Sequence, residues 1–123
     1  MGNINDRLKA FKHAFNGLTA AIQTESHLKI HFLILLVVLN LGFYFNLNAY
    51  EWMAVIFCSA MVIALELINS ALEALCDLVM PNENNKIKYI KNVAAASVLV
   101  SAIASIIIGY LVFWPHIVFK WLT

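Results

Sequence analysis

Four polar side chains recur on one face of a long apolar segment near the middle of the chain. They are Glu66, Asn69, Glu73 and Asp77. Their spacings of three or four residues match the turn of a helix, so all four share one face. Fourteen uncharged, mostly apolar residues (52–65) precede the first of them, where an ionisable group is costly. Such a row can bind a divalent cation, carry protons, or act as a base on a lipid head group.

The members of this row differ in what they predict. Glu66 directly follows the apolar run, so we expect it to do chemistry. Asp77 lies where the helix should leave the apolar layer, and solvation there explains it equally well. Glu25 can approach Glu73 if the helices form a compact bundle, and two carboxylates with phosphate oxygens suit Mg²⁺. By spacing alone, an ordinary solvated charge also explains Glu25.

The composition places these residues in an integral membrane protein. Of 123 residues, 63% are hydrophobic and 12% are charged, which is more apolar surface than a soluble domain of this size can bury. The formal net charge is +1 and no basic run could hold a phosphate backbone, so we expect no nucleic-acid binding. We expect a single all-α membrane domain over residues 1–123.

One surface helix and three transmembrane helices are expected. In residues 5–23 apolar side chains recur at alternating steps of three and four, which predicts an amphipathic helix lying along the membrane surface. The three expected spans are 28–45, 52–79 and 93–114. The second exceeds an apolar core of roughly 30 Å, so its last turns should emerge from the membrane. We expect Pro115 to end the third span.

The distribution of basic residues predicts the orientation. Seven of the eight lysines and arginines fall in 7–29 and 86–91, and only Lys120 follows the third span. An excess of positive charge marks the cytoplasmic side, so the N-terminus is expected inside and the C-terminus outside. The polar link over 81–92 then lies in the cytoplasm, whereas His116 is expected to be isolated on the other side.

The segment ELINSALEALCD, residues 66–77, resembles the signature of the prokaryotic diacylglycerol kinase family, E-x-x-N-[ST]-A-[IL]-E-x-x-x-D. The resemblance extends to FNGL at 15–18, TE at 24–25, EW at 51–52 and K-x-x-A-A-A-x-V starting at Lys91. It implies a homotrimeric, multi-pass lipid kinase of the bacterial cytoplasmic (inner) membrane. Such a kinase moves the γ-phosphate of MgATP onto the hydroxyl of a membrane lipid, either diacylglycerol or undecaprenol.

The same resemblance implies roles for particular residues. Glu66 resembles the general base that takes the proton from the lipid hydroxyl, and Glu25 and Glu73 resemble the pair that holds Mg²⁺. Lys91 resembles the lysine that meets the nucleotide phosphates, and Ala95 falls where the lipid substrate enters. The other positions implied to lie at the ATP are Asn69, Asp77, Asn82, Glu83, Asn84 and Asn92.

Three departures from the family pattern lie on the nucleotide side. The family usually has Lys-Asp where this chain has Lys91-Asn92, and commonly E-[YF]-H where residues 82–84 read NEN. An arginine or tyrosine often found in the surface helix is not matched, with Asp6 and His13 at the nearest positions. Altered nucleotide preference, weak activity and lost activity all stay open. The alternative is a catalytically impaired, kinase-like trimeric membrane scaffold or lipid-binding protein.

Overall fold

A computed structural model describes residues 2–123 as four helices. In chain order they are α1 (Ile4–Thr24), α2 (Ser26–Tyr44), α3 (Ala49–Val79) and α4 (Asn85–Leu122). No strand occurs among the described residues, so the all-α prediction is confirmed. The helices α2, α3 and α4 are each long and apolar enough to cross a membrane, as the fold class requires.

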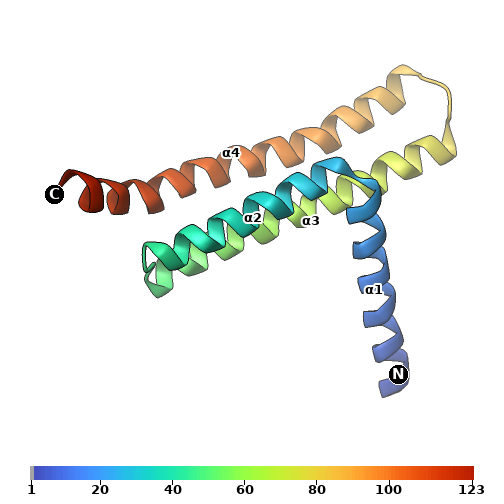
Figure 1. Ribbon diagram of the computed structural model, residues 1–123. Coiled ribbons are helices and arrows are strands. Elements are labelled where there is room, and N and C mark those ends of the chain that lie inside the picture. Colours follow the sequence, from blue (N-terminus) through green and yellow to red (C-terminus); the bar gives the residue numbers. More distant parts are fainter. Residues whose placement is uncertain (1) are drawn as a thin grey trace.

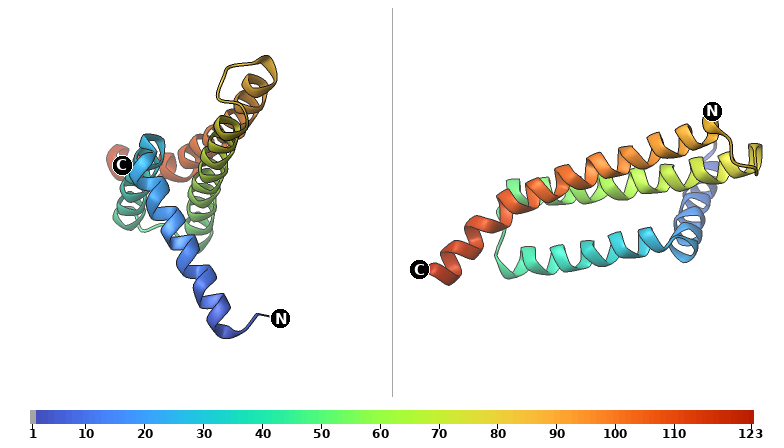
Figure 2. Two further views of the ribbon diagram at one scale, coloured as in Figure 1. Left: turned by 90° about the vertical axis from the view of Figure 1, so that its right-hand side faces the viewer. Right: turned by 90° about the horizontal axis from the view of Figure 1, so that it is seen from above.

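The helices form an elongated bundle from which α1 projects at a steep angle (Figure 1). α3 and α4 run side by side along most of their length, and α2 folds back against α3 (Figure 2). α1 touches both α2 and α3. Across residues 2–123, the backbones of α2 and α4 do not come close to each other, whereas α3 lies close to both.

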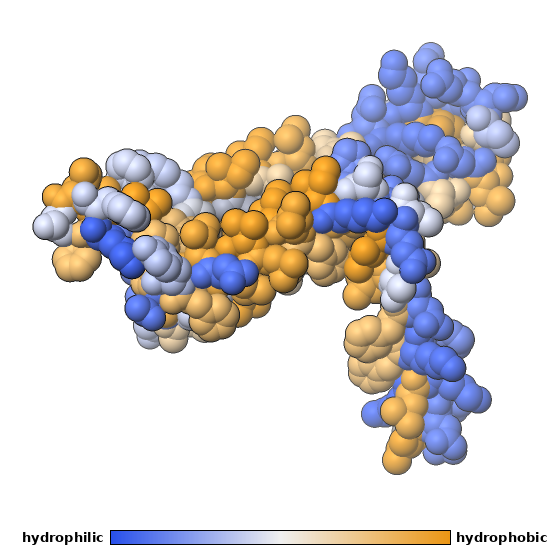
Figure 3. Space-filling model, viewed as in Figure 1, coloured by the Kyte–Doolittle hydropathy of each residue, from blue (hydrophilic) through white to orange (hydrophobic). Residues whose placement is uncertain are grey.

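The N-terminal helix α1 is amphipathic. Its first turn is closed by the Asp6 carboxylate, which accepts a hydrogen bond from the backbone N–H of Asn3 at 3.1 Å. Its apolar side chains, including Leu8, Phe11 and Phe15, stay exposed, and no described residue of α1 is buried. Figure 3 shows hydrophobic surface along one side of this helix and hydrophilic surface along the other. This stripe is the one that the spacing predicted, and a membrane surface is still its predicted partner.

The turn between α2 and α3 depends on close packing and on a helix cap. The Trp52 ring lies against Gly42, where an added Cβ would be only 2.5 Å from the ring. Asn46 takes a positive φ of 53°, a conformation that asparagine tolerates better than most residues. The Asn48 side chain accepts a hydrogen bond from the Glu51 N–H at 2.9 Å, and Glu51 accepts one from the Asn48 N–H at 3.2 Å. This reciprocal pair starts α3.

The last helix is longer at both ends than the sequence predicted. The expected polar link over 81–92 is wrong beyond Asn84, because the Asn84 side chain accepts a hydrogen bond from the Ile87 N–H at 2.8 Å and caps α4 there. The expectation that Pro115 ends the helix is also wrong, since α4 continues through it to Leu122. Proline removes one backbone donor from the helix at this point.

Candidate active site

The polar row of α3 becomes more exposed along its length. Glu66 and Asn69 are buried, with 6% and 9% of their surface exposed, whereas Glu73 is half-buried and Asp77 is exposed. α4 packs against α3, and Lys91 of α4 reaches Asp77 at the end of this row. The predicted single face is therefore real, and it runs from a covered interior to an open end.

The buried part of the row lacks hydrogen-bond partners. Asn69 Oδ1 is buried and accepts no hydrogen bond. Glu66 likewise has no side-chain hydrogen bond or ion pair within residues 2–123. An unpaired polar group away from water is costly, and native proteins hold few of them. A buried, unpaired amide oxygen one turn from Glu66 indicates a site whose partner is a ligand.

A lysine side chain lies at the open end of the row. The Lys91 ammonium lies 2.6 Å from a carboxylate oxygen of Asp77, which joins the beginning of α4 to the end of α3. Both side chains keep substantial exposure, at 37% and 66% respectively. The structure thus brings together two residues whose proximity the spacing did not predict.

Glu25 lies half-buried at the boundary between α1 and α2, where it is the N-cap residue of α2. In the described part of the chain, no group of three or more His, Cys, Asp or Glu side chains could hold a metal ion by itself. Glu25 and Glu73 are nevertheless hard oxygen donors, and Mg²⁺ usually takes one or two carboxylates together with water and substrate phosphates. The oxygens of Glu25 and Glu73 therefore suit a Mg²⁺ ion that is also bound by substrate phosphates. Binding of Mg²⁺ by these two residues is still a prediction.

The other residues predicted to lie at the nucleotide are placed differently from one another. Asn82 and Glu83 are exposed in the short link before α4, and Asn92 is exposed on α4. Asn84 uses its side-chain oxygen to cap α4, so this oxygen is already engaged. Ala95, predicted at the lipid's entry, is exposed on α4.

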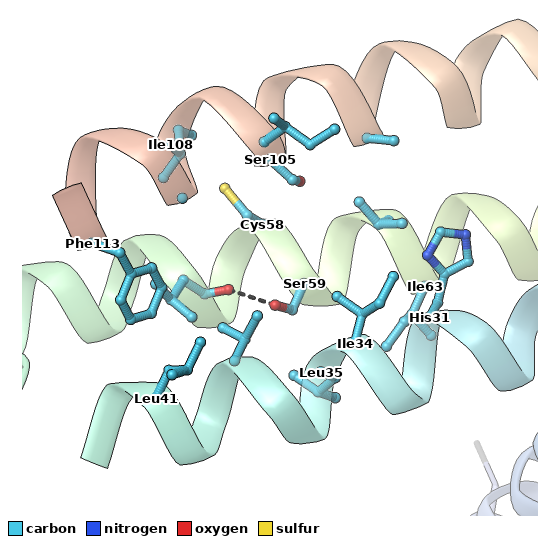
Figure 4. Close-up of a pocket in the computed structure, with 16 residues that line it drawn as sticks. His31, Ile34, Leu35, Leu41, Cys58, Ser59, Ile63, Ser105, Ile108 and Phe113 are labelled. Atoms are coloured by element: carbon cyan, nitrogen blue, oxygen red, sulfur yellow. Dashed lines mark hydrogen bonds between the residues drawn. The ribbon is translucent and has the colours of Figure 1, made fainter. Parts of the chain in front are cut away.

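An apolar groove that the sequence did not reveal lies between α2, α3 and α4 (Figure 4). Its volume is about 330 Å³. Side chains from all three helices point into it, among them Leu35, Cys58 and Ile108. Val62 also lines it and lies one helical turn from Glu66 on the same face of α3. The groove therefore leads toward the buried carboxylate.

The opposite end of the bundle contains a second pair of ionisable groups. His116 Nε2 lies 2.7 Å from Glu51 Oε2, so the expectation that His116 is isolated is wrong. These residues are 65 positions apart, and neither has a local motif that would predict their meeting.

The fold and the site together define a helical membrane protein with a row of carboxylates, a facing lysine and an apolar groove. Over residues 12–113 the sequence matches the prokaryotic diacylglycerol kinase family, and the chain belongs to that family. It is 34% identical to an undecaprenol kinase of Bacillus subtilis, over 93% of each chain. It is 32% identical to a diacylglycerol kinase of Synechocystis, over 83% of this chain and 59% of that relative. Family and relatives together support a lipid kinase.

Proposed function

We propose that the protein is an ATP-dependent kinase that transfers the γ-phosphate to the hydroxyl of a membrane lipid, with undecaprenol as the preferred lipid. The observation that carries this proposal is the buried, unpartnered Glu66 on the face of α3 that also holds Glu73. The preference for undecaprenol rests on the similarity to the Bacillus subtilis relative, which covers 93% of both chains. Diacylglycerol is the competing substrate.

Glu66 acts as the general base. Its carboxylate takes the proton of the lipid hydroxyl while the hydroxyl oxygen forms a bond to the γ-phosphorus. The bond from that phosphorus to the bridging oxygen breaks, and the products are ADP and the lipid phosphate. Phosphoryl transfer needs mainly positioning and charge neutralisation, which the neighbouring side chains supply. Asn69 lies one turn from Glu66, and its unpaired Oδ1 can accept a hydrogen bond from a substrate donor.

Charges at the open end of the face receive the triphosphate. Glu25 and Glu73 would hold Mg²⁺, which neutralises phosphate oxygens when bound. Lys91 already points into this region through its contact with Asp77, and it can exchange that carboxylate for a phosphate oxygen. ATP then reaches the site from the end of α3 that lies outside the apolar layer.

The apolar groove suits the lipid's hydrocarbon chain. It lies on the face of α3 that carries Glu66, so a chain within it places its hydroxyl end toward the carboxylate. We further propose that the N-terminus faces the cytoplasm of a bacterial cell, in accord with the lysine and arginine distribution. Assembly as a homotrimer belongs to the same proposal, since exposed apolar faces of α2 and α4 leave room for neighbouring copies. Chemical cross-linking in micelles would report the number of chains.

The test is transfer of label from [γ-³²P]ATP by purified protein in micelles containing Mg²⁺. Undecaprenol and diacylglycerol are supplied in separate reactions, with wild type and Glu66→Gln compared. We expect label mainly on undecaprenol, reduced by at least about 100-fold in Glu66→Gln, which is the usual contribution of a general base. Glu51→Gln is the matched control, because it makes the same change at the opposite end of α3.

The outcomes separate the alternatives. Label mainly on diacylglycerol would keep the kinase and overturn the lipid preference. Label that persists in Glu66→Gln would overturn the role of Glu66. If neither lipid is labelled while the Bacillus subtilis relative labels readily, the kinase proposal fails. The impaired, kinase-like scaffold would then be the remaining explanation.

A further inference from the structure

At the end of the bundle opposite Lys91, the Glu51 carboxylate contacts both the start of α3 and the last turns of α4. Glu51 Oε1 accepts a hydrogen bond from the Asn48 N–H at 3.2 Å, which closes the first turn of α3. Glu51 Oε2 lies 2.7 Å from His116 Nε2 on α4. Each carboxylate oxygen therefore has one partner, and Glu51 joins the start of one helix to the last turns of another. The two side chains are only 21% and 28% exposed.

Further contacts surround this pair. The Lys120 ammonium lies 3.7 Å from the centre of the Tyr44 ring, a cation–π geometry. The Phe45 ring centre lies 6.0 Å from that of His116 and 6.2 Å from that of Phe113. All of these contacts join α4 to the turn between α2 and α3.

These contacts lie just after Pro115, where α4 lacks one backbone hydrogen bond. Pro115 has no N–H to donate to the turn before it, so residues 116–122 are joined to the rest of α4 by a weakened stretch of helix. The side-chain contacts of His116 and Lys120 are then what hold these last turns against α2 and α3.

We propose that Glu51 and His116 form a pH-dependent clasp that holds the last turns of α4 against the α2–α3 turn. A protonated imidazole makes a charge-assisted hydrogen bond to a carboxylate, and a neutral one loses the attraction between the charges. Imidazole groups ordinarily change charge near pH 6.5 and carboxylic acids near pH 4. The clasp is therefore tighter while the imidazole is protonated and the carboxylate is ionised, and looser once the imidazole is neutral.

Two other titratable groups lie near the Glu51–His116 pair. They are Lys120 on α4 and Tyr44 on α2. Lysine and tyrosine side chains ordinarily change charge only well above pH 8.

The clasp does not depend on the kinase proposal, because it involves none of the residues assigned to the site. On the predicted orientation it faces the outside of the cell, while Asp77 and Lys91 face the cytoplasm. External pH would then act on the far end of α3 and α4 without reaching the charged residues of the site.

The test is hydrogen–deuterium exchange of the full-length protein in lipid nanodiscs at pH 5.5 and pH 8.0. Exchange in residues 116–122 is compared between wild type and His116→Gln at the same pH, so that the intrinsic pH dependence of exchange cancels. We expect the variant to exchange about two- to five-fold faster at pH 5.5, as for a partly exposed ion pair, and nearly equally at pH 8.0. His13→Gln, an exposed change on α1, should behave as wild type at both values.

A second variant keeps the test decisive. Glu51→Gln can retain the capping hydrogen bond but removes the charge, so it should reproduce the effect of His116→Gln, and the double variant should add nothing further. Equal ratios at both pH values would show a contact of packing only and overturn the clasp. Unchanged protection in Glu51→Gln would overturn it as well.

Discussion

The Lys91 ammonium lies 2.6 Å from Asp77, so the first turns of α4 are joined to the last turns of α3 at the open end of the polar row. On the proposed function, this contact keeps the Lys91 ammonium where a phosphate oxygen of ATP would arrive. Because both side chains are partly exposed, the pair can separate at little cost. Lys91 is therefore positioned in the free protein and can still be released to a ligand.

Replacing Lys91 should weaken the use of ATP. Lys91→Met is expected to lower kcat/KM for ATP by about 10- to 100-fold, because a hydrogen bond to a charged group contributes about 1.5–3 kcal/mol. Lys91→Arg keeps the charge and should recover part of the loss. Initial rates against ATP concentration at saturating lipid measure both. A change confined to the lipid KM would contradict this assignment.

Glu66→Gln should abolish most of the kinase activity without lowering the stability of the fold. The carboxylate is buried without a partner, so replacing it by a neutral amide of similar size should leave the free energy of unfolding unchanged or raise it. Thermal unfolding in micelles, monitored by circular dichroism, measures this effect. A lower melting temperature would mean that Glu66 serves mainly to hold the fold, and loss of activity would then follow from unfolding.

The two proposed metal ligands should alter the requirement for Mg²⁺. Glu25→Gln and Glu73→Gln are each expected to shift the half-activating Mg²⁺ concentration upward, by about ten-fold, since one charged ligand of a hard cation is lost. The measurement is a titration of kinase rate against free Mg²⁺. Glu66→Gln is the control, because it should lower the rate without moving the midpoint. Unmoved midpoints in both ligand variants would exclude the assigned metal site.

Gly42 should be intolerant of even a methyl group. A Cβ at this position would lie 2.5 Å from the Trp52 ring, so Gly42→Ala is expected to lower the free energy of unfolding by about 1–3 kcal/mol. Gly109→Ala is the matched control, because its Cβ would have no atom within 4 Å and alanine favours helix. Both are measured by unfolding in micelles. Trp52→Phe should restore part of the loss in Gly42→Ala if the ring is the cause.

Much of the architecture was readable from local patterns. Spacings of three and four residues predicted the face shared by Glu66, Glu73 and Asp77, and the same periodicity predicted the amphipathic α1. Long apolar runs predicted the three spanning helices. These properties depend only on neighbours along one helix, which is why a single sequence is sufficient to indicate them.

The limits of local patterns appear at the ends of α4. Pro115 and the polar residues of 81–92 favour breaks in helix, yet the helix spans both regions. The Asn84 cap defines the start of α4, and His116 and Lys120 contact residues of α3 and α2 near its end. Capping by Asn84 could have been predicted from its type, whereas the two end contacts could not, because their partners lie on other helices.

The sequence by itself determined which residues share a face, which segments are apolar enough to span, and the family to which they belong. Only the tertiary structure decided how deeply each polar residue lies, since burial of Glu66 and exposure of Asp77 depend on where α4 covers α3. It also decided that Lys91 meets Asp77 and that His116 meets Glu51. The physical reason is that pairing between helices depends on their relative rotation and register, which side chains from several helices set together.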